Sequence, residues 1–113
     1  MSKFDLHDHR AISDRLSMQS HDEKIRVTAH AHQEMVEDNI CLGDILAVLN
    51  RAAVIENYPE HQRGPCCLVY GQGVSGNDIH VVCTTSLDLA IIITVYEPKP
   101  PKWHSPFTRR NSQ

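Results

Sequence analysis

One run of seven residues constrains the fold of this chain most strongly: 90–96, with the sequence AIIITVY. β-Branched and aromatic side chains fill most of its positions, and Pro98, which cannot donate a hydrogen bond to a β-ladder, follows two residues later. These features indicate a buried strand rather than a short helix. We therefore expect this run at the centre of a sheet, with the rest of the chain arranged around it.

The length and charge of the chain limit what it can be. A chain of 113 residues corresponds to one domain and buries roughly two-thirds of its unfolded surface. Its formal net charge is −3 and only 5% of its residues are aromatic. Binding to nucleic acid depends on clustered Lys and Arg and on rings that stack with bases. The composition therefore disfavours a protein that binds nucleic acid through charge.

The cysteines and the N-terminus indicate a cytoplasmic protein. Cys41, Cys66, Cys67 and Cys83 form no C-x-x-C pair, and the adjacent residues Cys66 and Cys67 would point to opposite faces of a strand. They are poor candidates for a disulfide or a metal site, so we expect reduced, packed thiols. The N-terminus has no apolar leader and no run is long enough to span a bilayer, so no membrane association is predicted.

The first quarter of the chain is polar and rich in histidine. Residues 1–24 are expected to form an N-terminal extension that is either disordered or folded as a short helix around 8–18. Ile12 and Leu16, spaced four residues apart, give such a helix a thin apolar stripe. This stripe would dock on the domain or on a second copy of it.

Two helices follow a short first strand. Alternation predicts a strand at 25–28, and Thr28 is a suitable N-cap for a helix over 29–38. Asn39 tolerates the left-handed conformation that ends many helices. A second helix is predicted at about 42–52.

The second half of the chain alternates with the period of strands. Short connections favour antiparallel hairpins between the strands predicted at 54–58, 66–71, 79–84 and 90–96. The spacing Gly71-x-Gly73-x-x-Gly76 matches a dinucleotide-binding pattern, but a strand follows it where that pattern requires a helix. No cofactor is therefore predicted.

Side-chain alternation assigns the two faces of the last hairpin. Ile79, Val81 and Cys83 share one apolar face, whereas His80 and Tyr96 lie on the other. The two helices are the only cover for the apolar face. We therefore predict an α+β fold with two helices packed on one face of a small antiparallel sheet, and any site on the opposite, partly open face.

Several motifs in order resemble the bacterial domain-of-unknown-function family numbered 4258. They are VTAHA at 27–31, DNI at 38–40, VIENYP at 54–59, GPCCLV at 64–69, IHVV at 79–82 and ITVYEP at 93–98. The resemblance covers residues 25–103, including Lys102 and Trp103, and leaves 104–113 as a C-terminal tail. It implies a RelE-like fold, because the family looks like a branch of the RelE-like and MqsR-like toxins.

The resemblance also implies an activity and a partner. Its members often stand beside a gene for a small zinc-finger protein of the antitoxin type, so this chain would be the toxin-like half of a pair that cleaves RNA without a metal. Such cleavage needs general acid and base groups and a cation for the phosphate. The chain departs from the family where arginines usually stand in the first helix, since His32, Glu34 and Asp38 occupy those positions.

Three residues are candidates for catalysis: His80 on the open face, Tyr96 on the neighbouring strand, and His30 in the Thr-x-His motif of the family. Arg63 and Glu97 are candidates for binding substrate, Arg63 as a phosphate contact in a Pro/Gly-rich loop. Each also has an ordinary structural explanation, as a packed histidine, a strand-end tyrosine or a solvated charge.

No metal site is predicted, because His30 and His32 are two positions apart on a helix and do not face each other. Two hypotheses about function remain open. One is a metal-independent ribonuclease that acts on RNA. The other is a non-catalytic binding module, or degenerate toxin homologue, that holds a zinc-finger partner or forms a homo-oligomer.

Overall fold

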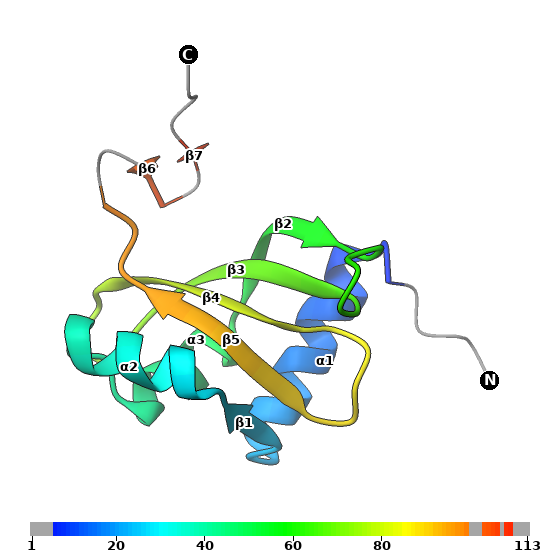
Figure 1. The fold of residues 1–113 in the computed structure, drawn as a ribbon, viewed down its shortest axis with the longest axis horizontal. Coiled ribbons are helices and arrows are strands. Elements are labelled where there is room, and N and C mark those ends of the chain that lie inside the picture. The colour runs from blue at the N-terminus through cyan, green and yellow to red at the C-terminus, as the bar shows by residue number, and fades with distance from the viewer. Residues whose placement is uncertain (1–5, 100–102, 107, 110–113) are drawn as a thin grey trace.

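The computed structural model of the chain describes residues 6–99, 103–106 and 108–109, and Lys102 lies outside them. Figure 1 shows three helices packed against a curved sheet. The elements are α1 (His9–His21), β1 (Ile25–Val27), α2 (Ala29–Asp38), α3 (Leu42–Asn50), β2 (Ala53–Tyr58), β3 (Cys66–Gln72), β4 (Asp78–Thr84), β5 (Ala90–Tyr96), β6 (Trp103–Ser105) and β7 (Thr108–Arg109). The last two strands form a small separate hairpin.

The main sheet has five strands in the order β1-β5-β4-β3-β2. Strands β2 to β5 are antiparallel to their neighbours, as predicted, but β1 pairs parallel with β5, with Ile25 opposite Ala90. The prediction of a purely antiparallel sheet is therefore wrong at this edge. Short connections fix the direction of a strand only within a hairpin, and β1 is linked to β2, on the opposite edge, through α2 and α3.

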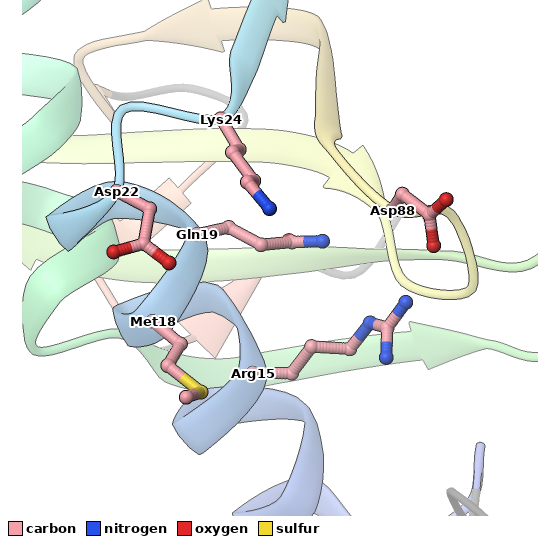
Figure 2. Close-up of a pocket in the computed structure, with 6 residues that line it drawn as sticks. All are labelled: Arg15, Met18, Gln19, Asp22, Lys24 and Asp88. Atoms are coloured by element: carbon pink, nitrogen blue, oxygen red, sulfur yellow. The ribbon is translucent and has the colours of Figure 1, made fainter.

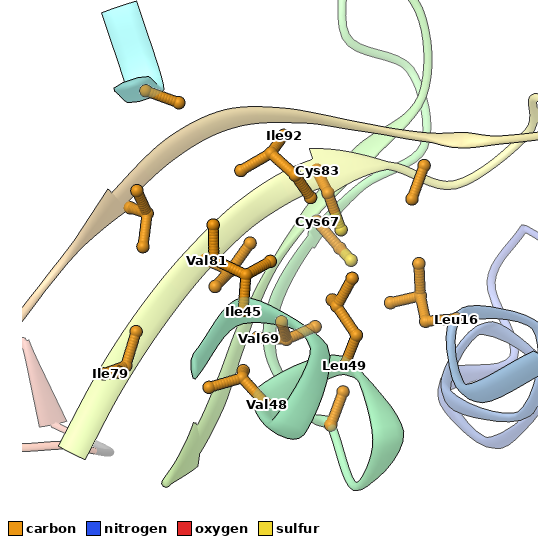
Figure 3. Close-up of a cluster of buried hydrophobic side chains, with 14 of the residues drawn as sticks. Leu16, Ile45, Val48, Leu49, Cys67, Val69, Ile79, Val81, Cys83 and Ile92 are labelled. Atoms are coloured by element: carbon orange, nitrogen blue, oxygen red, sulfur yellow. The ribbon is translucent and has the colours of Figure 1, made fainter. Parts of the chain in front are cut away.

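The mixed α+β class is confirmed, but three helices contribute to the core rather than two. Ile12 and Leu16 of α1 are fully buried in the same cluster as Ile45 and Leu49 of α3. Figure 3 shows this cluster between the helices and one face of the sheet. The apolar stripe of α1 is thin, but these two aliphatic side chains, fully buried, stabilise its docking.

The ends of α2 follow from its sequence. The Thr28 side chain accepts a hydrogen bond from the amide of Ala31, and Asn39 has φ of 55°, in the left-handed region. The amide of Ile40 returns to the carbonyl of Met35 at 2.8 Å. Both predicted caps are therefore present.

Side chains of α2 also complete the edge of β5. Strand β1 pairs with β5 only as far as Ile92. Beyond it, Glu34 accepts a hydrogen bond from the amide of Val95 at 3.1 Å, and Asp38 accepts one from the amide of Glu97 at 3.0 Å. Glu34 and Asp38 thus satisfy backbone donors that would otherwise form an open sheet edge.

Replacing Asp38 by alanine is expected to lower the free energy of unfolding by about 1–2 kcal/mol, because the amide of Glu97 loses its acceptor. Glu37→Ala is the matched control, since Glu37 is an exposed acid one position earlier in the same helix. Its effect should stay within about 0.5 kcal/mol. Urea unfolding of both variants measures the difference, and equal effects would show that the bond to β5 contributes nothing.

Candidate functional site

His80, Tyr96 and Tyr70 stand side by side on three neighbouring strands. His80 is paired with Tyr70 of β3 and with Tyr96 of β5. Nδ1 of His80 lies 3.2 Å from the Tyr96 hydroxyl, and the Tyr70 ring meets the imidazole edge-on, with centroids 6.2 Å apart. Because Val81 faces the helices, these rings share the opposite face of the sheet. Alternation therefore places His80 and Tyr96 together, as expected from the sequence.

His80 is nevertheless fully buried, with 0% of its surface exposed. The expectation of an open imidazole is wrong, because the chain returns across this face after β5. The carbonyl oxygen of Pro106 lies 2.5 Å from Nε2. A carbonyl oxygen only accepts, so Nε2 carries a proton, and the Tyr96 hydroxyl occupies Nδ1. Both ring nitrogens of His80 are thus engaged within the protein.

The rest of this face is also partly closed. The Tyr70 hydroxyl donates to Asp78 at 2.5 Å. This hydrogen bond raises the pKa of Tyr70, and burial adds to the shift. Leu68, which points to the same face, is only 1% exposed. The aromatic cluster therefore resembles a second small core more than an open catalytic surface.

His30, the third catalytic candidate, and Glu97, a candidate for binding substrate, lie elsewhere. His30 is 67% exposed and its Nε2 pairs with Glu34 at 3.3 Å. The carboxylate of Glu97 accepts from the Asn77 side chain at 3.0 Å and pairs with Lys99 at 3.2 Å. Among the described residues, the structure therefore does not gather His30, Glu97 and His80 into one site.

Arg63 lines a hollow of about 450 Å³ on the same sheet face as His80. The loop between β2 and β3 supplies one wall, and Cys66, Val82 and Thr84 supply others. Val82 stands two residues after His80, so the hollow and the aromatic cluster are neighbours. Side-chain alternation could have found Val82 and Thr84 for this site, but the fold of the loop could not be predicted from local sequence.

A second hollow, of about 330 Å³, lies between α1 and the β4–β5 connection (Figure 2). Arg15 and Gln19 both donate to the carbonyl of Leu87, at 2.6 and 2.8 Å. Two acids, Asp22 and Asp88, offset the cations that line it. These contacts attach the loop to α1, and the balanced charges do not favour a particular ligand.

Within 6–99, 103–106 and 108–109, no three His, Cys, Asp or Glu side chains gather as metal ligands would. No helix in that part of the chain is long and apolar enough to cross a bilayer.

Comparison with known families defines the class of this domain. The family described as a domain of unknown function (DUF4258) matches residues 27–97, from β1 to just beyond β5. The chain belongs to this family. No curated protein and no solved structure matches this chain significantly.

Proposed function

We propose that this protein is a RelE-like domain of the toxin type that acts by binding a protein partner rather than by cleaving RNA. Helices packed on one face of a small, mostly antiparallel sheet support the comparison with RelE-like domains. The partner expected from the resemblance is a small zinc-finger protein of the antitoxin type.

The hydrogen bonding of His80 carries this proposal. A general acid or base must reach the proton that it transfers. The imidazole is fully buried and has Tyr96 on one nitrogen and Pro106 on the other. Its contacts are those of a residue that holds the C-terminal segment against the sheet.

The charges around α2 support the same proposal. A nuclease that lacks a metal needs cations for the phosphate that it cleaves. The family's usual arginines are replaced in α2 by residues that include Glu34 and Asp38, which bind backbone amides of β5. These carboxylates are fixed in the structure and would repel a phosphate.

One end of the molecule exposes apolar side chains that suit a protein contact. Val36, Leu42 and Val74 are large exposed hydrophobic residues at the end where α2 finishes, α3 begins and β3 turns into β4. Exposed apolar groups of this kind commonly mark interaction surfaces. Acidic neighbours such as Glu37 and a net charge of −3 favour a basic partner.

Co-expression with a small zinc-finger protein of the kind that the resemblance implies, if one is encoded by a neighbouring gene, tests the proposal. We expect the two proteins to elute together in size-exclusion chromatography, and Val36→Lys to separate them. Met18→Lys is the matched control, because Met18 is 68% exposed, against 71% for Val36, but lies on α1. A chain that elutes alone, or a complex equally tolerant of both variants, would contradict the proposal. Elution of the chain by itself as a dimer would identify a second copy as the partner instead.

A ribonuclease remains the second candidate, because His80 and Tyr96 converge next to a hollow that carries Arg63. If the protein cleaves RNA, His80→Ala should reduce cleavage of a labelled single strand by about 10²-fold or more. His32→Ala, which changes an exposed histidine of α2, should leave the rate unchanged. The binding proposal predicts that the unchanged protein, His80→Ala and His32→Ala all fail to cleave the RNA.

A further inference from the structure

The hollow beside Arg63 differs from the rest of the surface in its charge. Among the described residues that line this hollow, Arg63 is the one permanently charged side chain, and none of the others is a carboxylate. Within the described part of the chain, Arg63 forms no ion pair. A cation without a counter-charge at the mouth of a concave site attracts an anion.

His61 adds a second donor at the same mouth. Its Nδ1 accepts a hydrogen bond from the amide of Arg63 at 3.2 Å. A neutral imidazole that accepts at Nδ1 carries its proton on Nε2. His61 therefore adds an N–H group to the hollow that Arg63 also lines, and the two side chains together can donate to the oxygens of one anionic group.

The floor of the hollow is apolar. Val82 and Ile93 line it, and Ile93 occupies the position where the register between β4 and β5 shifts. At this bulge Ile93 has no partner residue on β4, and its side chain lines the hollow. Burial raises the pKa of the Cys66 thiol, and the neighbouring Cys67 raises it further. Cys66 therefore lines the hollow as a neutral group.

We propose that this hollow binds a small ligand in which one anionic group, a phosphate or a carboxylate, is joined to a compact apolar body. The anion would meet Arg63 and His61, and the body would lie on Val82 and Ile93. A volume of about 450 Å³ is within the range of small-molecule sites. This site is independent of the proposed partner, whose contact surface lies at the α2–α3 end.

NMR titration of the full chain with four probes tests the inference: phenyl phosphate, benzoate, benzyl alcohol and inorganic phosphate. We expect saturable shifts of the amides of the hollow with one or both aromatic anions, and weaker binding of the other two probes. The stronger of phenyl phosphate and benzoate identifies the anionic group.

Arg63→Gln should weaken binding of the preferred anion by about tenfold. Arg51→Gln is the control, because Arg51 is an exposed arginine outside the hollow, and it should bind like the unchanged protein. Arg63 is exposed, so its replacement is expected to preserve the fold. Absence of saturable shifts, equal binding by Arg63→Gln, or binding of inorganic phosphate as tight as that of the preferred aromatic anion would overturn the inference. Failure of the zinc-finger complex would not affect it.

Discussion

Replacing Gly71 by alanine is expected to lower the free energy of unfolding by about 3 kcal/mol, because the new methyl group has no room. A Cβ atom at Gly71 would lie 2.9 Å from Cα of Val48 and 3.1 Å from its carbonyl oxygen. These are backbone atoms of α3, so the helix itself would have to move away from β3.

Gly43→Ala provides the control for this effect. A Cβ atom at Gly43 meets Cys41 Sγ at 3.6 Å, which is an ordinary contact. Alanine also favours the helix by up to about 1 kcal/mol. In thermal and urea unfolding, Gly71→Ala should therefore lower the free energy of unfolding, whereas Gly43→Ala should leave it unchanged or raise it. A Gly71→Ala protein as stable as the parent would show that α3 does not pack this closely on β3.

Asp44→Ala should cost about 2–4 kcal/mol, because Asp44 is buried and its loss leaves two backbone donors without an acceptor. One oxygen accepts from the amide of Cys41 and the other from the amide of Val74, each at 2.9 Å. The residue thus caps α3 and attaches the β3–β4 turn to it. The exposed acid Asp14 provides the control, and Asp14→Ala should change stability by no more than about 0.5 kcal/mol.

The contribution of Asp44 should also depend on pH. Burial alone would raise the pKa of this carboxyl, but hydrogen bonds from the amides of Cys41 and Val74 and from the Cys41 thiol outweigh burial and lower it. A carboxyl with a lowered pKa stabilises the fold above the ordinary value of 3.8, and this stability is lost as pH falls below that value. The stability difference between the protein and Asp44→Asn should therefore shrink in acid. A difference that is constant with pH would contradict this.

Local chemistry accounts for what could be predicted from the sequence. Thr28 and Asn39 are cap residues whose effects act within a few positions, and α2 has the predicted bounds. Alternation has a period of two, so within β4 it places His80 on the face opposite Val81. The pairing of β4 with β5 then puts Tyr96 on the same face as His80.

The features of the structure that differ from the sequence-based predictions depend on contacts between distant segments of the chain. The direction of β1 is decided by its pairing with β5, about 65 positions later in the chain. The burial of His80 depends on Pro106, which lies beyond the last strand of the main sheet. The roles of Glu34 and Asp38 were not predicted, because their bonds to β5 cannot be inferred from helical periodicity.

The most direct test of the central claim is a long-range ¹H–¹⁵N correlation spectrum of the imidazole of His80 in the full chain. Occupation of both ring nitrogens predicts a slowly exchanging proton on Nε2 and a change in the Nδ1 resonance in Tyr96→Phe. A ring that exchanges its proton rapidly with water, and does not respond to Tyr96→Phe, would mean that the imidazole is available for proton transfer.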